Sequence, residues 1–247
     1  MEHEASGENF LGTAAPLVPP LARGCFVSAA VEVTAPAVQK PLLRGVLHTF
    51  AAAIAAGAGA TLVSFTPGVR ESVAVAVFAV SLVSLFTVSA TYHRINWSVG
   101  GRAWMRRADH ASIFVLIAGT YTPIAMLGLP RETGTQLMFA IWGGAVLGVL
   151  QSLFWVHAPK FVAAVLALAV GWTLVPYVGD VRRAYGDGVL ALILGGGVAY
   201  SLGAVAYATR RPALWPKVFG YHEVFHALTL VGATMHFIAV RAIVVAH

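Results

Sequence analysis

Long apolar runs alternate with short polar breaks along the chain from His48 onward. Each run has about 18 to 24 residues, the length that an α-helix needs to cross about 30 Å of hydrocarbon. The pattern therefore predicts seven membrane-spanning helices. Their expected ranges are 44–66, 71–93, 108–129, 136–156, 160–178, 188–208 and 220–244.

The first 40 residues do not follow this pattern. They contain several prolines and many small residues, and they lack the basic segment and unbroken apolar core of a secretory signal. We expect a disordered, uncleaved tail at 1–40 and a membrane domain at 41–247.

The composition supports an all-α membrane protein, a seven-transmembrane helix bundle. Hydrophobic residues make up 58% of the chain and charged residues 11%, whereas soluble domains have about 25% charged residues. Cys25 is the only cysteine, which excludes an intramolecular disulfide and argues against thiolate metal ligands. The net charge of +6 does not indicate a nucleic-acid partner, because the basic residues lie between apolar runs and no nucleic-acid-binding motif accompanies them.

The distribution of basic residues predicts the orientation in the membrane. Eleven of the 16 Lys and Arg residues lie in the N-terminal tail or in alternate loops that share its side, and five lie on the opposite side. Lys and Arg in short loops keep those loops in the cytoplasm. We therefore expect a multi-pass protein of the plasma (inner) membrane with a cytoplasmic N-terminus and, after seven crossings, an external C-terminus.

Five polar residues lie in or beside the apolar runs: Ser89, His93, Asp109, His222 and His226. Ionisable groups near bilayer depth are costly and usually mark a functional site. With the predicted topology, all five fall at cytoplasmic helix ends, where the third and seventh spans begin and the second ends. The candidate site residues therefore share one membrane depth.

The residue types at this depth suggest a metal centre. His222 and His226 are four residues apart and so share a helix face, and His93 adds a third imidazole from another helix. Three protein ligands with a fourth position left to water are typical of catalytic zinc sites. Zn²⁺ lowers the pKa of such a water toward neutrality, Asp109 would take its proton, and Ser89 would orient water or a substrate carbonyl. The alternative is that the His-x3-His spacing arises by chance and these histidines simply meet the membrane interface.

Four further polar residues are not expected to bind the metal. His110 points about 100° away from Asp109 on a helix, which suggests a supporting role. His236 lies ten residues beyond His226, about 15 Å deeper, where packing or a relay is the expected role. His48 and Glu223 are also kept out of the ligand set.

Three segments together resemble the hemolysin III proteins, within the progestin and adipoQ receptor (PAQR) family. The segments are SATYHR at 89–94, RRADHASIFVLIAGTYTP at 106–123 and HEVFHALTLVGATMHF at 222–237. The resemblance runs from about His48 to the last helix. It implies a seven-helix bundle with a zinc ion near the cytoplasmic face, bound by His93, His222 and His226, with Asp109 and Ser89 beside the zinc-bound water. In the animal adiponectin receptors of this family, the same site is associated with ceramide hydrolysis, and the wider superfamily includes alkaline ceramidases.

Three functions follow as hypotheses. The first is a zinc-dependent hydrolase of a lipid amide or ester, whose membrane-lipid substrate enters from the inner leaflet. The second is a membrane receptor or sensor with a structural zinc site, which four protein ligands would ordinarily close. The third is a cytolytic protein, suggested by the hemolysin label alone. Histidine ligands do not by themselves distinguish zinc from copper, iron or nickel.

Overall fold

A computed structural model describes residues 41–155 and 158–246, which contain seven α-helices, one 3₁₀-helix (η1) and no β-strand. The predicted tail, 1–40, lies outside the described residues. The helices are α1 (Val46–Ser64), α2 (Val69–Arg94), α3 (Val99–Leu127), α4 (Arg131–Phe154), α5 (Lys160–Gly171), η1 (Trp172–Tyr177), α6 (Val178–Thr209) and α7 (Tyr221–Val245).

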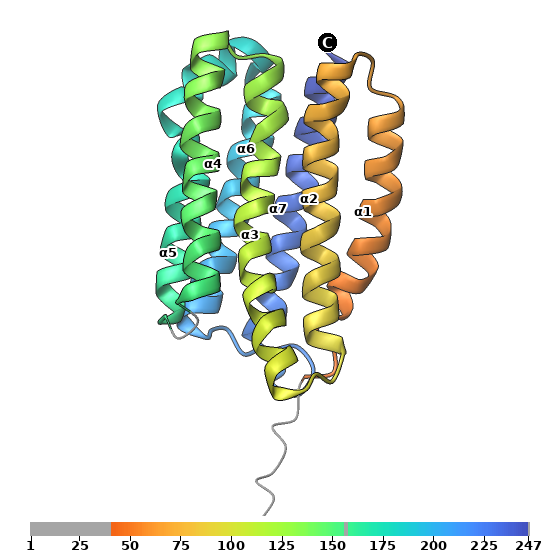
Figure 1. The fold of residues 1–247 in the computed structure, drawn as a ribbon, viewed down its shortest axis with the longest axis vertical. Helices are drawn as coiled ribbons and strands as arrows, with labels where there is room; N and C mark the ends of the chain where they lie inside the picture. Colours follow the sequence, from red (N-terminus) through yellow and green to blue (C-terminus); the bar gives the residue numbers. More distant parts are fainter. Residues whose placement is uncertain (1–40, 156–157, 247) are drawn as a thin grey trace, which may run out of the picture. The chain divides into compact units, whose positions relative to one another are not determined.

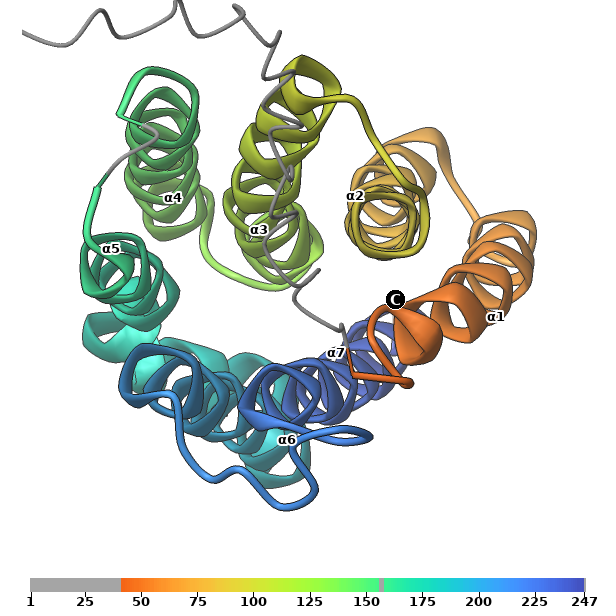
Figure 2. The ribbon, with the colours of Figure 1, turned by 90° about the horizontal axis from the view of Figure 1, so that it is seen from below.

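The helices stand side by side as an up-and-down bundle (Figure 1). Seen along the bundle, they follow one another around a ring in chain order, and α7 packs beside α1 to close it (Figure 2). α3 also contacts α5 and α7 across the ring. The α2–α3 and α6–α7 connections and the start of α1 lie at the same end of the bundle, the lower end in Figure 1.

The described residues contain six segments that are long and apolar enough to cross a membrane. The fifth of these, Phe161–Thr209, includes nearly all of α5, then η1 and α6, with no loop between them. α5 alone has 12 residues and is therefore about 18 Å long, shorter than the roughly 30 Å hydrocarbon layer. The prediction of an all-helical, multi-pass membrane protein is confirmed, whereas seven crossings and their direction remain predictions.

One predicted helix start was wrong. α3 begins at Val99 rather than 108, after Ser98, whose Oγ accepts a hydrogen bond from Gly101 N (3.2 Å) and caps the helix. α6 extends from Val178, but Gly186 breaks its helical backbone with φ 79° and ψ 174°, and the helix after this kink begins close to the predicted start at 188. Apolar residues mark the part of a helix within the lipid, and both helices continue beyond that part as polar turns.

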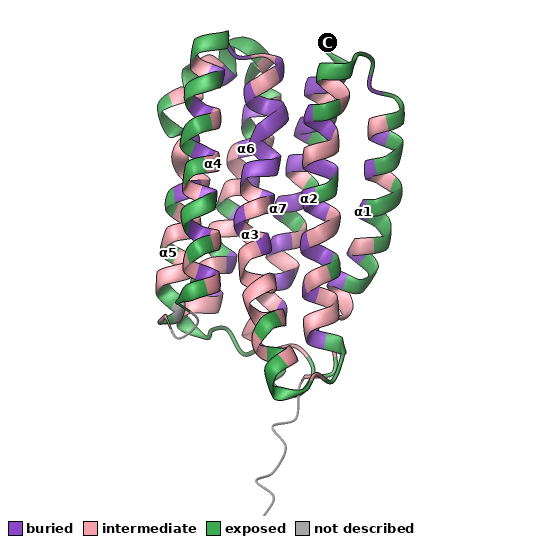
Figure 3. Ribbon diagram, viewed as in Figure 1, coloured by how far each residue is buried: buried purple, intermediate pink, exposed green. Residues whose placement is uncertain are grey.

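The outer and inner faces of the bundle differ in what they contact. Large apolar side chains such as Phe50, Ile54 and Phe139 are exposed on the outside, where lipid would surround them. Figure 3 shows buried residues on the inward-facing sides of the helices, with a dense group in the upper half of α3. Phe114 on α3 is among these buried side chains.

Small residues let the helices approach closely. A Cβ placed on Gly148 of α4 would collide with the Phe114 ring, and one on Gly196 of α6 would collide with the His236 ring of α7. Between helices, lipid supplies no hydrophobic driving force, so such close packing provides much of the stability.

Replacing Gly148 with alanine should destabilise the bundle. Ala favours a helix by about 1 kcal/mol over Gly, but overpacking against Phe114 costs about 1 to 3 kcal/mol. Gly143, on the same helix, is exposed with no atom near its Cβ position, so Gly143→Ala is the matched control. In a thermal unfolding assay of detergent-solubilised protein, Gly148→Ala should melt several degrees below Gly143→Ala. Equal melting temperatures would contradict the close α3–α4 packing.

Candidate metal centre

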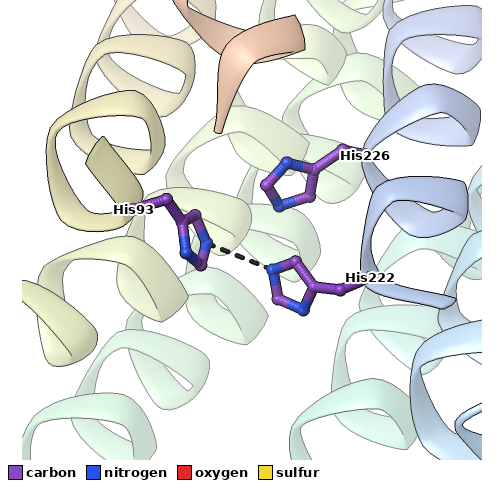
Figure 4. Close-up of side chains that lie close together, drawn as sticks. All are labelled: His93, His222 and His226. Carbon is purple, nitrogen blue, oxygen red and sulfur yellow. Dashed lines mark hydrogen bonds between the residues drawn. The ribbon is translucent and has the colours of Figure 1, made fainter. Parts of the chain in front are cut away.

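Three histidines from two helices converge inside the lower end of the bundle (Figure 4). His93 lies in the last turn of α2, and His222 and His226 lie in the first two turns of α7. Each offers a ring nitrogen, and the three nitrogens lie within 4.8 Å of one another. His93 and His226 are buried, and His222 is partly buried.

The separation of these nitrogens fits a single transition-metal ion. His222 Nε2 lies 3.1 Å from His93 Nε2. Two imidazole nitrogens bound to one tetrahedral Zn²⁺ at 2.0–2.1 Å would be about 3.3 Å apart. The donor set also suits zinc, because all three donors are imidazoles. The metal ion itself remains a prediction.

Asp109 and Ser89 lie beside the three histidines. The Asp109 carboxylate approaches His93 Nε2 to 4.0 Å and forms a side-chain hydrogen bond with the buried Ser89. Its oxygens do not belong to the group of donors that all lie within 4.8 Å of one another. As placed, Asp109 is therefore a neighbour of the three-histidine set rather than a fourth member of it.

The position of Asp109 within α3 differs from the prediction. It was predicted to open its helix, but α3 begins ten residues earlier, at Val99. These additional residues, nearly three helical turns, extend past the end of the apolar run, so Asp109 still lies level with the last turn of α2.

His48 contacts the centre, although the sequence did not indicate this. Its ring stacks on His226, with centroids 3.9 Å apart and planes 5° apart. Both ring nitrogens of His48 are buried and lack a hydrogen-bond partner within the described part of the chain. Its position in the first turn of α1, at the same end of the bundle as the other histidines, is the signal that would have found it.

The start of α7 is fastened to the start of α1 by a buried ion pair. Arg44 Nε donates to Glu223 Oε1 (2.5 Å), and Glu223 Oε2 accepts from Gly220 N (2.8 Å). Glu223 is only 1% exposed and lies between the two α7 histidines in sequence. Both of its carboxylate oxygens have partners in the frame, and it holds the helix turn that carries two of the three imidazoles.

Gly45 lets the start of α1 approach His93 closely. Its backbone is left-handed (φ +77°), and a Cβ there would lie 2.7 Å from His93 Cβ. Nearby, Leu42 N donates to Lys217 O (3.0 Å), which ties the segment before α1 to the α6–α7 connection. These contacts hold α1, α2 and α7 together around the centre.

A largely apolar cavity adjoins the centre. Its wall includes Ser89, Asp109, His222 and His226 and continues along α3, α5, α6 and α7 to Leu174 and Ile193. His110 and His236 line it too, and His236 Nε2 donates to Ile193 O (3.0 Å). The donor group therefore opens onto space that suits a hydrocarbon chain.

The sequence profile of the haemolysin-III related family matches residues 37–237 of the chain. The chain belongs to this family. The match includes all five predicted site residues, Ser89, His93, Asp109, His222 and His226.

Curated relatives include two bacterial hemolysin-3 proteins and a plant heptahelical protein. The chain is 28% identical to the "Hemolysin-3 homolog" of Bacillus subtilis (strain 168) over 170 residues, 69% of this chain and 76% of that one. It is 29% identical to "Hemolysin-3" of Bacillus cereus over 168 residues, 68% and 74% of the two chains. The "Heptahelical transmembrane protein ADIPOR2" of Oryza sativa subsp. japonica is 30% identical over 181 residues, 66% and 79%. The predicted resemblance to the hemolysin III proteins, within the PAQR family, is thereby confirmed.

Removing the Arg44 charge should destabilise the bundle more than removing an exposed ion pair. Arg44→Gln leaves the buried Glu223 carboxylate without its partner, which typically costs about 3 to 5 kcal/mol. The control is Arg183→Gln, which breaks an exposed pair with Asp180 at the other end of the bundle and should cost at most about 1 kcal/mol. Thermal unfolding in detergent measures both. The double variant Arg44→Gln/Glu223→Gln should recover part of the loss, and equal effects of the two single variants would contradict the role of the buried pair.

Proposed function

We propose that the protein is a zinc-dependent hydrolase of a lipid amide or ester in the plasma membrane. The observation that carries the proposal is the group of three histidine nitrogens beside a carboxylate, facing an apolar cavity. A closed structural site would need a fourth protein ligand, and Asp109 does not complete the group.

The proposed orientation places the centre at the cytoplasmic side. The end of the bundle that carries the three histidines also carries the loops richer in Lys and Arg, which favours that end in the cytoplasm. α5 and η1 together are about 30 Å long, and α5 packs against α6. This supports counting α5 with η1 as one crossing and α6 as another, giving seven. The C-terminus would then be external, and a lipid substrate would reach the centre from the inner leaflet between helices.

The residues around the centre can carry out a hydrolysis with balanced proton transfers. A bound Zn²⁺ supplies an acidified water and an electrophilic contact for the carbonyl oxygen. Asp109 accepts a proton as the water oxygen bonds to the carbonyl carbon, and it then returns that proton to the nitrogen or oxygen of the leaving group as the old bond breaks. Ser89, hydrogen-bonded to Asp109, keeps the carboxylate oriented. The products are a fatty acid and an amine or alcohol.

A receptor with a structural zinc is the second candidate, favoured by the name of the rice relative, ADIPOR2. The two functions differ in what Asp109 does. As a proton carrier it is dispensable for holding the ion, and as a structural ligand it is required. The name of the Bacillus cereus relative also suggests cytolysis, which would require a conducting path.

The purified protein should contain about one zinc ion per chain, and the three histidines should be needed to hold it. We expect His93→Ala, His222→Ala and His226→Ala each to lose most of the metal, because each removes one of three ligands. His236→Ala, about 15 Å deeper on α7 than His226, should keep it. Elemental analysis of detergent-purified variants measures the content. Full metal in all three ligand variants would refute the centre.

Asp109→Asn should abolish hydrolysis while leaving the ion in place. General acid–base groups contribute about 10² to 10⁴-fold to rate, so turnover should fall by that range. The assay follows fatty-acid release from ceramide and from a panel of simpler acyl amides and esters, with metal content measured on the same samples. Loss of the metal in Asp109→Asn, with no hydrolysis by the wild type, would instead favour the structural site.

A further inference from the structure

Arg106 lines the same cavity as the three-histidine centre. It precedes Asp109 by three residues on α3, so the two share a helix face about 4.5 Å apart along the axis. Arg106 is partly buried and lies nearer than Asp109 to the start of α3. It therefore stands between the centre and the end of the bundle.

The other two arginines of α3 have contacts of their own. Arg107 donates from Nε to Leu153 O (3.1 Å) at the end of α4, and its guanidinium lies 4.7 Å from the Trp104 ring. Arg102 is exposed and lies 5.5 Å from the Tyr92 ring. Arg106, by contrast, forms no hydrogen bond or ion pair with the residues that the structure describes.

A partly buried guanidinium without an anion is unfavourable, because it gives up water without gaining a partner. Its planar group of donors matches the oxygens of a carboxylate or phosphate. The nearby acid, Asp109, is engaged with Ser89 and approaches His93 instead. Among the described residues, Arg106 interacts electrostatically with Tyr207 but has no anionic partner. An oxyanion that arrives with a ligand would supply one.

We propose that the cavity binds an anionic amphiphile whose carboxylate or phosphate is held by Arg106. The proposal rests on the hydrolase function above and specifies its substrate class: a long-chain amide or ester with an oxyanion on the leaving group. The acyl chain extends along the apolar wall toward Leu174 and Ile193, and the carbonyl lies at the histidines. For an N-acyl amino acid, water oxygen bonds to the acyl carbon, the C–N bond breaks and the nitrogen gains a proton, which releases a fatty acid and an amino acid.

The first test measures binding, which does not depend on turnover. Full-length protein in neutral maltoside detergent is titrated with dodecyl phosphate, dodecanol and inorganic phosphate by calorimetry. We expect dodecyl phosphate to bind roughly tenfold or more tightly than dodecanol, and inorganic phosphate to bind weakly, because a charge-assisted hydrogen bond and chain burial both contribute. Arg106→Gln should remove the preference, Arg106→Lys should keep much of it, and the matched charge control Arg102→Gln should keep it fully.

Contact between phosphate and an ion at the histidines would be common to all of these variants, so it does not affect the comparison. A preference unchanged in Arg106→Gln, or lost equally in Arg102→Gln, overturns the proposal. If inorganic phosphate binds as tightly as dodecyl phosphate, the proposal that the ligand is an amphiphile is overturned.

The second test compares hydrolysis of N-lauroylglycine and its neutral analogue N-lauroylglycinamide. Wild type should prefer the acid roughly tenfold in kcat/KM, and Arg106→Gln should lower the rate for the acid alone, mainly through KM. Hydrolysis of both substrates at equal rates refutes the headgroup assignment but leaves the hydrolase intact. If neither is hydrolysed while ceramide or another substrate of the first assay is, the headgroup assignment fails alone. If no substrate of either assay is hydrolysed, the proposed function fails, while the binding test still decides whether Arg106 holds an oxyanion.

Discussion

The structure depends on satisfying polar side chains inside a bundle that lipid surrounds. Hydrocarbon offers no hydrogen-bond partners, so polar groups at that depth must find one another or a bound ion. Here His93, His222 and His226 turn toward one point, and Asp109 pairs with Ser89 beside them. A divalent ion would satisfy three nitrogens at once, which is why metal binding is the simplest explanation of their convergence.

The centre is supported by a frame that is itself polar. Arg44 and Glu223 join the starts of α1 and α7, and Gly45 allows the start of α1 to touch His93. His48 adds a flat stacking surface for His226. Contacts of this kind fix the orientation of ligand rings, which metal sites require as much as the ligands themselves.

Close packing and open space occur in different parts of the same bundle. Glycines bring α4 against α3 and α6 against α7, whereas the region between α3, α5, α6 and α7 is left as a cavity. In a bundle held by close contacts, such an opening costs packing energy. The cavity lies beside the donor group and beside Arg106, which has no ion pair among the described residues. This position supports the proposal that the cavity holds a long-chain ligand with its polar end at the histidines.

The sequence alone determined the fold class, the approximate helix positions and the five polar residues, because hydrophobic run length and the cost of buried charge are local properties. The His-x3-His spacing also placed two imidazoles on one face without knowledge of any other helix. Only the tertiary structure decided which groups join them. The stacking of His48, the pairing of Arg44 with Glu223 and the position of Arg106 at the cavity wall each depend on how separate helices rotate and shift against one another. Those rotations follow from packing at contacts such as Gly148 with Phe114, which no single segment of the chain specifies.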